Sequence, residues 1–428
     1  MPIRIATVLA ITLSACGARS ELIVRGSDGA APIDASSPRD VPFVRPDCGT
    51  TTAPGSIRYT IDGVVGRGAI DPSANAYVPV AIGDGQRGVR SVDPCGRLRW
   101  QTTVWPTDGH RFGDARLTTR GDVLLTDVRS TNGMEAIARL DPNGAMLGLV
   151  AADSQVARTF AVPVGTGPIV ASVDRSNLVN QIERFDADGM RLETIPDWSN
   201  AHECVATPDL VSCLDRAWDV PAHRRLWNHS FEILDGTLRH VVGEALNGAT
   251  HYTFFFGISS FALQANESRT GRPVFRTMVA RSTTGQSNML AAGPVIRDDG
   301  EIFVYLRVGG VGGAVYEYSP AGMRVASFAA ESATEVFDDG GNLAIGRDGT
   351  VYLAVGRAVY ALDRMLHVRW MLPTMERVDR AWSILSPSGD LFVHTERDRI
   401  LVVATDSPGA SDAAWPMSRG DERNGNGR

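Results

Sequence analysis

Residues 344–370 read AIGRDGTVYLAVGRAVYALDRMLHVRW. Within them, Thr350–Val355 and Ala358–Leu362 are rich in β-branched and apolar residues, and Val368–Trp370 begins a third segment of this kind. The Asp348-Gly349 pair between them is typical of a turn. The stretch therefore predicts a meander of three short strands, which is too small to bury an apolar face on its own.

The same pattern recurs along most of the chain. The strand that corresponds to Ala358–Leu362 returns near residues 91, 138, 183, 232, 278, 316, 360 and 402, with a period of about 45 residues. Gly-marked turns separate the copies, as in Asp141-Pro142-Asn143-Gly144 and Ser319-Pro320-Ala321-Gly322. This period is typical of one four-stranded propeller blade. We therefore predict an all-β, eight-bladed β-propeller, with seven blades as the alternative.

The repeat resembles that of quinoprotein-like propellers, also called PQQ-like repeats. In that family a strand ends in an Asp, a Gly follows in the turn, and a Trp docks on the neighbouring blade. The residues Tyr360–Asp363 with Trp370, and Val92-Asp93 with Gly96 and Trp100, match this pattern. The resemblance covers about 350 residues and implies that Trp100 and Trp370 are blade-docking residues. Other residues stand at or near the Trp position in further copies, namely Leu149, Leu192 and Phe328.

The N-terminus has the features of a bacterial export signal. Arg4 precedes a mostly apolar segment, Ile5–Leu13, which is too short to cross a bilayer as a helix. Leu13-Ser14-Ala15-Cys16 resembles the lipobox of bacterial lipoproteins, a family in which cleavage precedes the Cys and its thiol receives a diacylglycerol. The alternative is an ordinary secretory signal with an incidental Cys. We predict a signal peptide over residues 1–15, lipidation at Cys16, and a membrane-anchored place in the bacterial cell envelope.

The remaining chain divides by composition. Residues 16–47 contain four spaced prolines and no lasting hydrophobic period, which predicts a flexible tether. Residues 48–410 carry the repeats and are predicted to form the propeller. We expect residues 411–428 to form a tail that packs on a blade and frays at its end. Ser56–Thr60 resembles the outer part of a repeat, so we expect it to complete the last blade and hide its edge.

Four cysteines remain after Cys16. Pairing Thr207 with Leu210 in a hairpin would place Cys204 opposite Cys213, which predicts one cross-strand disulfide. By elimination, Cys48 would then bond to Cys95 and join the end of the tether to the first blade. Metal binding is the rival interpretation, but no CxxC or HxxxH spacing supports it.

The sequence offers little support for a catalytic or nucleic-acid-binding role. Its net charge is −7 without a basic cluster, so nucleic acid is not an expected partner. It lacks the adjacent Cys pair and the Ca²⁺-loop spacing of quinone-dependent propeller enzymes. Many acidic residues stand at repeat turns, where Asp caps the backbone: Asp141, Asp186, Asp298, Asp299, Asp348 and Asp363. We predict no catalytic residues, no metal and no cofactor.

One departure from the repeat is a candidate interface. Residues 215–229 include Trp and Arg side chains of the kind that dominate binding hot spots, namely Trp218, Arg224, Arg225 and Trp227. The alternative is a strand pair with an inter-blade Trp.

We interpret the chain as a lipid-anchored, exported scaffold that binds a protein or another envelope component. It is similar in build to the propeller lipoprotein of the outer-membrane β-barrel assembly machinery. An enzyme, either a quinone-dependent dehydrogenase or a carbohydrate-active hydrolase, is the alternative.

Overall fold

The computed structural model describes residues 46–411 apart from 50–51, 84, 107–113, 119, 130–134, 151–155, 164–168, 176–178, 187–189, 196–204, 208, 214–215, 229–239, 257–259, 282–289, 309–310 and 331–341. All 32 elements of regular structure in this part of the chain are β-strands. No helix long and apolar enough to span a membrane occurs among these residues.

The first four blades follow the chain in order. Blade 1 consists of β2 (Ala69–Ile70), β3 (Ala76–Gly83), β4 (Gln86–Val92) and β5 (Leu98–Pro106). Blade 2 consists of β6 (Ala115–Leu117), β7 (Val123–Arg129), β8 (Glu135–Leu140) and β9 (Met146–Val150). Blade 3 consists of β10 (Val156–Pro163), β11 (Ile169–Arg175), β12 (Val179–Phe185) and β13 (Arg191–Ile195). Blade 4 consists of β14 (Val205–Thr207), β15 (Leu210–Cys213), β16 (Arg216–Asp219) and β17 (Arg224–Asn228).

The remaining blades repeat this order, except that the last one borrows a strand from the N-terminus. Blade 5 consists of β18 (His240–Asn247), β19 (Thr250–Phe256), β20 (Ser260–Glu267) and β21 (Pro273–Arg281). Blade 6 consists of β22 (Leu290–Ile296), β23 (Ile302–Val308), β24 (Val311–Tyr318) and β25 (Arg324–Ala329). Blade 7 consists of β26 (Asn342–Ile345), β27 (Val351–Val355), β28 (Ala358–Leu362) and β29 (Val368–Pro373). Blade 8 consists of β30 (Val378–Leu385), β31 (Asp390–Thr395), β32 (Arg399–Ala404) and β1 (Ile57–Asp62).

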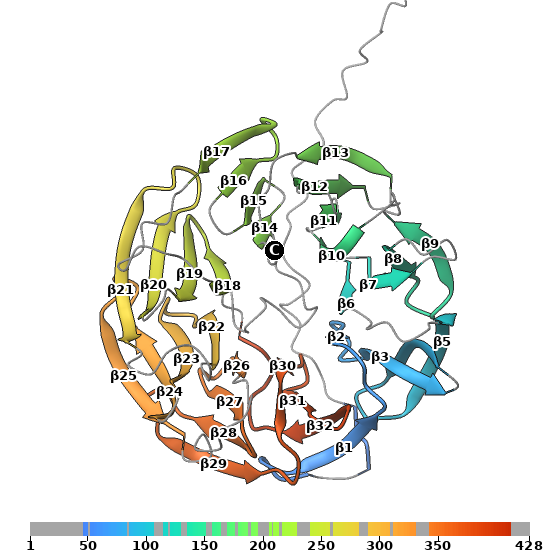
Figure 1. Ribbon diagram of the computed structural model, residues 1–428. Coiled ribbons are helices and arrows are strands. Elements are labelled where there is room, and N and C mark those ends of the chain that lie inside the picture. Colours follow the sequence, from blue (N-terminus) through green and yellow to red (C-terminus); the bar gives the residue numbers. More distant parts are fainter. Residues whose placement is uncertain are drawn as a thin grey trace, which may run out of the picture. The chain divides into compact units, whose positions relative to one another are not determined.

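The described residues thus form eight four-stranded antiparallel sheets, and the predicted all-β propeller is confirmed. Figure 1 looks along the axis around which the blades are arranged, with the first strand of each blade innermost. The inner strands of successive blades contact one another, as β18, β22, β26 and β30 do.

The N-terminal strand closes blade 8, as the sequence predicted. β1 pairs with β32 in antiparallel register, with Tyr59 opposite Val402 and Ile61 opposite Ile400. This pairing covers the edge of β32, whose backbone groups would otherwise lack partners. The ring is therefore closed by two segments from opposite ends of the chain.

Turn chemistry explains the repeat. Asp141 precedes the turn between β8 and β9. Its Oδ1 accepts hydrogen bonds from the backbone N–H groups of Asn143 and Ala145, each with a donor–acceptor distance of 2.8 Å. Asp363 caps the equivalent turn in blade 7 in the same way. The backbone N–H of His367 holds the pKa of the Asp363 carboxyl below its usual value. The prediction that these acids cap turns is confirmed at both positions.

The hydrophobic core lies between the blades. One cluster joins blades 7, 8 and 1 through residues such as Tyr352, Val402 and Val78, and another joins blades 4, 5 and 6 through residues such as Trp227 and Phe254. Middle strands are buried on both faces, whereas outer strands such as β29 alternate between exposed and half-buried residues. Each blade is consequently stabilised mainly by its two neighbours.

The chain after β32 crosses onto blade 7. The backbone N–H of Arg347 donates to the Gly409 carbonyl over 2.9 Å, and the N–H of Ser411 donates to Ile345 over 2.9 Å. This contact places the start of the predicted tail against the inner strand of a blade. Residues 412–428 lie outside the described residues.

Candidate functional site: the seam and the turn face

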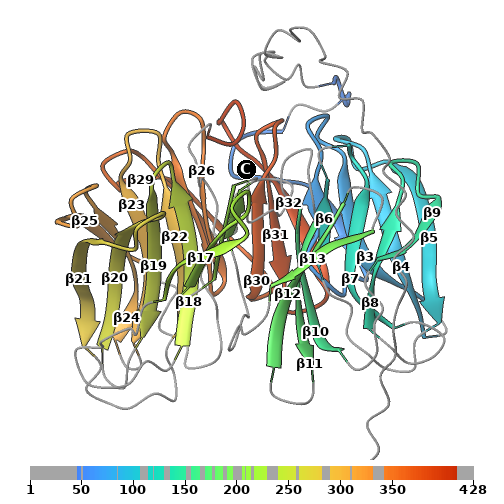
Figure 2. The same cartoon turned by 90° about the horizontal axis from the view of Figure 1, so that it is seen from above.

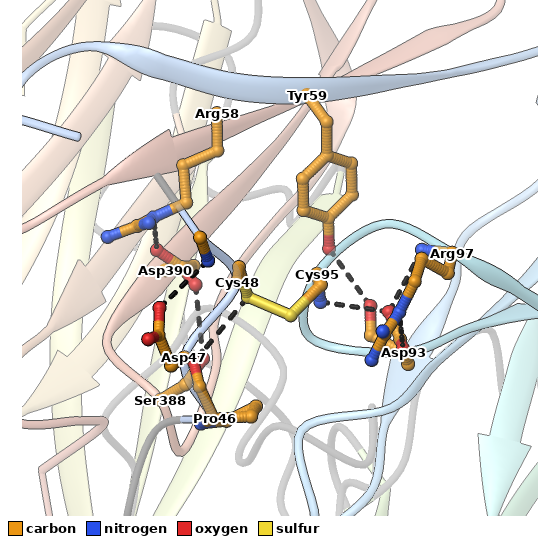
Figure 3. The surroundings of a disulfide bond; sticks show 11 residues. Pro46, Asp47, Cys48, Arg58, Tyr59, Asp93, Cys95, Arg97, Ser388 and Asp390 are labelled. Atoms are coloured by element: carbon orange, nitrogen blue, oxygen red, sulfur yellow. Dashed lines mark hydrogen bonds and ion pairs between the residues drawn. A yellow bond between two sulfur atoms is a disulfide. The ribbon is translucent and has the colours of Figure 1, made fainter. Parts of the chain in front are cut away.

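The seam between blades 8 and 1 is held by a covalent bond. Cys48 and Cys95 form the predicted disulfide, with a Cα–Cα distance of 5.4 Å and a sequence separation of 47. Cys48 lies just before the strand that closes blade 8, and Cys95 lies in the turn between β4 and β5 of blade 1. Figure 3 shows the bond between these two segments. The disulfide therefore holds the segment that precedes β1 against the β4–β5 turn of blade 1.

Aromatic packing accompanies the disulfide. Tyr59 of β1 lies over Gly96, where a β-carbon would come within 2.7 Å of the ring. Asp93 shapes the same turn, because its Oδ1 accepts the backbone N–H groups of Cys95 and Arg97 over 2.9 Å each. The Cys95 side chain thus leaves a turn that is already fixed by its own hydrogen bonds and by Tyr59 (Figure 3).

A buried ion pair also holds β1 to blade 8. Arg58 Nε donates to Asp390 Oδ1 over 2.7 Å, and the Asp390 side chain is almost fully buried. Ser388 donates to the other oxygen of Asp390 over 3.2 Å. Tyr59 packs edge-to-face on Phe392, two residues after Asp390 on β31, so the ion pair and the ring contact lie on the same face of the sheet, next to a bulge in β1.

The predicted docking residues both lie at blade boundaries. Trp100 of blade 1 donates its indole N–H to the Pro142 carbonyl of blade 2 over 2.9 Å. Trp370 of blade 7 packs against Gly55, just before β1 of blade 8, where a β-carbon would lie 3.2 Å from the ring. In both cases an outer-strand ring reaches the place where the third and outer strands of the next blade come together.

Other outer strands use the same contact with residues that the sequence pattern did not single out. Phe275 of blade 5 covers Gly322 of blade 6, where a β-carbon would come within 2.4 Å of the ring. Thr277 then donates to the Gly322 carbonyl over 2.6 Å, as Thr102 does to Gly144 over 2.7 Å. An aromatic residue followed two positions later by Thr would have been a signal for this contact.

The candidate interface is corrected at Trp227. This Trp is buried, and its indole N–H donates to the Ser268 carbonyl of blade 5 over 2.8 Å. It occupies the blade-docking position, so its large apolar ring is used within the fold. Trp218 is half-buried on β16, and Arg224 and Arg225 are exposed on β17. The four residues therefore do not form one exposed surface.

The second predicted disulfide lies partly outside the described residues. β14 and β15 pair with Thr207 opposite Leu210 and Val205 opposite Ser212, which is the predicted register. Cys204 is outside the described residues, and so is Cys16. The Cys204–Cys213 bond and the lipidation at Cys16 remain predictions.

A cluster of charged side chains lies where blade 6 meets blade 7. The buried Arg297 contacts Asp299 over 2.9 Å, Glu317 over 3.1 Å, and Glu301. Burial and the neighbouring Glu301 raise the pKa of the Glu317 carboxyl to about 8. Arg297 also donates to the Arg364 carbonyl of blade 7 over 3.3 Å. The cluster thus connects two blades through one shared guanidinium.

These contacts define one end of the propeller, which we call the turn face. It carries the turns between the third and outer strands, including residues 93–97, 141–145, 319–323 and 363–367, and the hydrogen-bonded residues Asp186 and Met190. Figure 2 shows the blades from the side, with the strands running between the two ends. Among the described residues, no cluster of three or more His, Cys, Asp or Glu residues could hold a metal ion.

No protein-family model and no curated protein sequence matches the chain. Solved propeller structures match it at low identity. The Dos1 propeller has a TM-score of 0.54 and 9% identity, and the match covers 81% of this chain and 94% of that one. A catalytically inactive virginiamycin B lyase from Staphylococcus aureus, with quinupristin, has a TM-score of 0.46 and 11% identity over 80% and 95% of the two chains. At such identity, the likeness to the Dos1 propeller shows a common fold alone.

Proposed function

We propose that this chain is an exported β-propeller, anchored in a bacterial envelope membrane through Cys16, that binds or assembles other envelope components without catalysing a reaction. The quinoprotein-like character of its repeats belongs to the same proposal. The observation that carries it is the Cys48–Cys95 disulfide, because such bonds persist in oxidising compartments outside the cytoplasm. The bond also stands where the tether would meet the propeller.

The use of polar residues supports a scaffold. Carboxylates that could serve as acids or bases instead hold the fold: Asp93 and Asp141 cap turns, and Asp390 binds Arg58. The repeated docking of outer-strand rings gives a rigid frame whose surface is free to vary. These features favour binding by the surface of the ring over chemistry within it.

Lipidation is tested by comparing the wild-type protein with Cys16→Ser in a bacterial host. We expect the wild type in the membrane fraction, with a mature N-terminus at an acylated Cys16, because acyl chains partition into the bilayer. Cys16→Ser should remain unprocessed. Ser27→Ala, in the tether, is the matched control and should behave as the wild type. An unmodified Cys16 in the native mature protein, or cleavage elsewhere, contradicts the proposal.

The quinone-dependent dehydrogenase alternative is tested by incubating the purified protein with pyrroloquinoline quinone and Ca²⁺ and measuring dye-linked dehydrogenase activity. We expect no turnover of alcohols or aldose sugars, since the sequence lacks the adjacent Cys pair of the quinone enzymes. Quinone-dependent turnover would establish the enzymatic alternative instead.

A further inference from the structure

Four exposed apolar side chains lie in or next to the turns between the third and outer strands of four different blades. Leu98, Met190, Met323 and Met365 are 62%, 69%, 68% and 71% exposed. Each lies within or directly after the turn between the third and outer strands of its blade, namely blades 1, 3, 6 and 7. Single exposed apolar residues are ordinary, but several of them at the same kind of turn, at one end of a ring of blades, can form a shared surface.

Contacts between blades place these turns at one level. Trp100 reaches the Gly144 turn of blade 2, and Phe275 reaches the Gly322 turn of blade 6. Arg364, in the blade 7 turn, contacts Asp298 of blade 6 over 3.3 Å. All blades share one antiparallel strand order, so their third-to-outer turns, and with them the four side chains, lie at a single end of the propeller, the turn face.

An arginine stands next to each of the four apolar residues. Arg97, Arg191, Arg324 and Arg364 are all exposed. Three of them also pair with carboxylates, Asp93, Glu183 and Asp298, so the face carries charges of both signs. Apolar side chains with adjacent guanidinium groups suit the boundary between lipid headgroups and acyl chains, where the stems are buried and the charges meet phosphates.

The segment that precedes β1 is also held at this face. The disulfide holds Cys48 at Cys95, and Cys95 is three residues before Leu98 in the chain. If Cys16 carries the lipid, a tether of about thirty residues would have an average span of roughly 30 Å. This length brings the turn face within reach of the membrane that holds the anchor.

We infer that the turn face lies on the surface of that bilayer, with Leu98, Met190, Met323 and Met365 entering the interfacial region and the neighbouring arginines contacting lipid phosphates. The inference extends the proposed function, because it takes the anchor at Cys16 as the reason that the face meets a membrane. The opposite end of the propeller then faces away from the bilayer.

The test uses the chain from residue 16 with Cys16→Ser, so that neither the signal segment nor an acyl chain contributes to binding. Its flotation with vesicles of phosphatidylethanolamine and phosphatidylglycerol is compared with that of the variant that also carries Leu98→Ser, Met190→Ser, Met323→Ser and Met365→Ser. We expect the parent to bind the vesicles. The fourfold variant should bind with an affinity at least about tenfold lower, because its serine side chains transfer little apolar surface from water into the bilayer.

Met375→Ser is the matched control. Met375 is 96% exposed but lies at the opposite end, where its carbonyl accepts a hydrogen bond from Arg357 beside the β27–β28 hairpin. This variant should bind vesicles as the parent does. Equal binding by the fourfold variant, equal loss with Met375→Ser, or no binding by the parent overturns the inference. Since every protein here lacks an acyl chain, the result is independent of whether Cys16 is lipidated, and circular dichroism checks that each variant is folded.

Discussion

The indole N–H of Trp100 donates to the backbone carbonyl oxygen of Pro142 over 2.9 Å, which ties the outer strand of blade 1 to a turn of blade 2. The same ring covers Gly144, where a β-carbon would come within 2.6 Å. This contact, repeated with other rings around the propeller, makes the stability of each blade depend on the turn of the next.

Gly144→Ala should therefore destabilise the protein beyond the cost of its left-handed backbone. We expect the free energy of unfolding to fall by about 2–4 kcal/mol, because the new methyl group displaces the Trp100 ring. Gly121→Ala is the control: its φ of 82° is close to the 89° of Gly144, but a β-carbon there has ordinary contacts. That control should cost about 1 kcal/mol in urea unfolding. Equal losses at the two positions would show that the docked ring has room to move.

Removing the disulfide should weaken the seam without opening the ring. Replacing Cys48 and Cys95 together by Ser should lower the free energy of unfolding by about 4 kcal/mol in the chain-entropy account of a loop this long. β1 should remain paired with β32, because that pairing depends on backbone hydrogen bonds. Urea unfolding with and without reductant measures the effect. Adding reductant to the double variant is the control, because it reports any contribution from the other cysteines. If removing the Cys48–Cys95 bond left the urea midpoint unchanged, the prediction would be contradicted.

Arg58→Ala should destabilise the closing strand strongly. The Asp390 carboxylate is nearly fully buried and would lose its guanidinium partner, which costs about 3 kcal/mol for a buried pair. Hydrogen exchange of Ile57–Asp62 should accelerate, since the strand is at the sheet edge. Arg97→Ala breaks a pair whose Arg side chain is 75% exposed, and it should change stability by less than about 1 kcal/mol. Similar effects of the two substitutions would exclude a special role for the Arg58 pair.

Glu317 should make stability fall as the pH rises. Its pKa is raised in the folded protein to about 8 by burial and by Glu301, so the folded state retains a proton that the unfolded state releases above its usual pKa. The free energy of unfolding should decrease from about pH 5 to about pH 8. Glu317→Gln, which stays neutral and keeps an acceptor for Arg297, should remove most of this decrease and raise stability at pH 7.5 by about 1 kcal/mol or more.

Thermal unfolding of both proteins between pH 5 and pH 8 measures this difference. Glu267→Gln, on the exposed side chain that pairs with Arg272, serves as the control and should not flatten the profile. A wild-type profile that rises over this range would contradict the assignment to Glu317.

The sequence by itself determined the propeller and its closure. The turn pattern of Asp or Ser followed by Gly is local chemistry, because a capping carboxylate and a glycine act within five residues, and their period of about 45 residues is visible in the chain. The partial repeat at Ser56–Thr60 predicted β1, and the hairpin register predicted the pairing of Thr207 with Leu210. The disulfide between Cys48 and Cys95 followed from counting.

Only the tertiary structure decided which side chains meet between blades. The sequence left open whether Trp227 is an exposed anchor or an inter-blade residue, and the structure shows that it docks on Ser268. Phe275 makes the same kind of contact without a Trp. The structure also decided which exposed side chains share one end of the propeller, because this depends on how separate blades are placed side by side. These side chains are Leu98, Met190, Met323 and Met365. The physical reason is that strand formation depends on neighbouring residues, whereas docking depends on sheet twist and on register between segments tens to hundreds of residues apart.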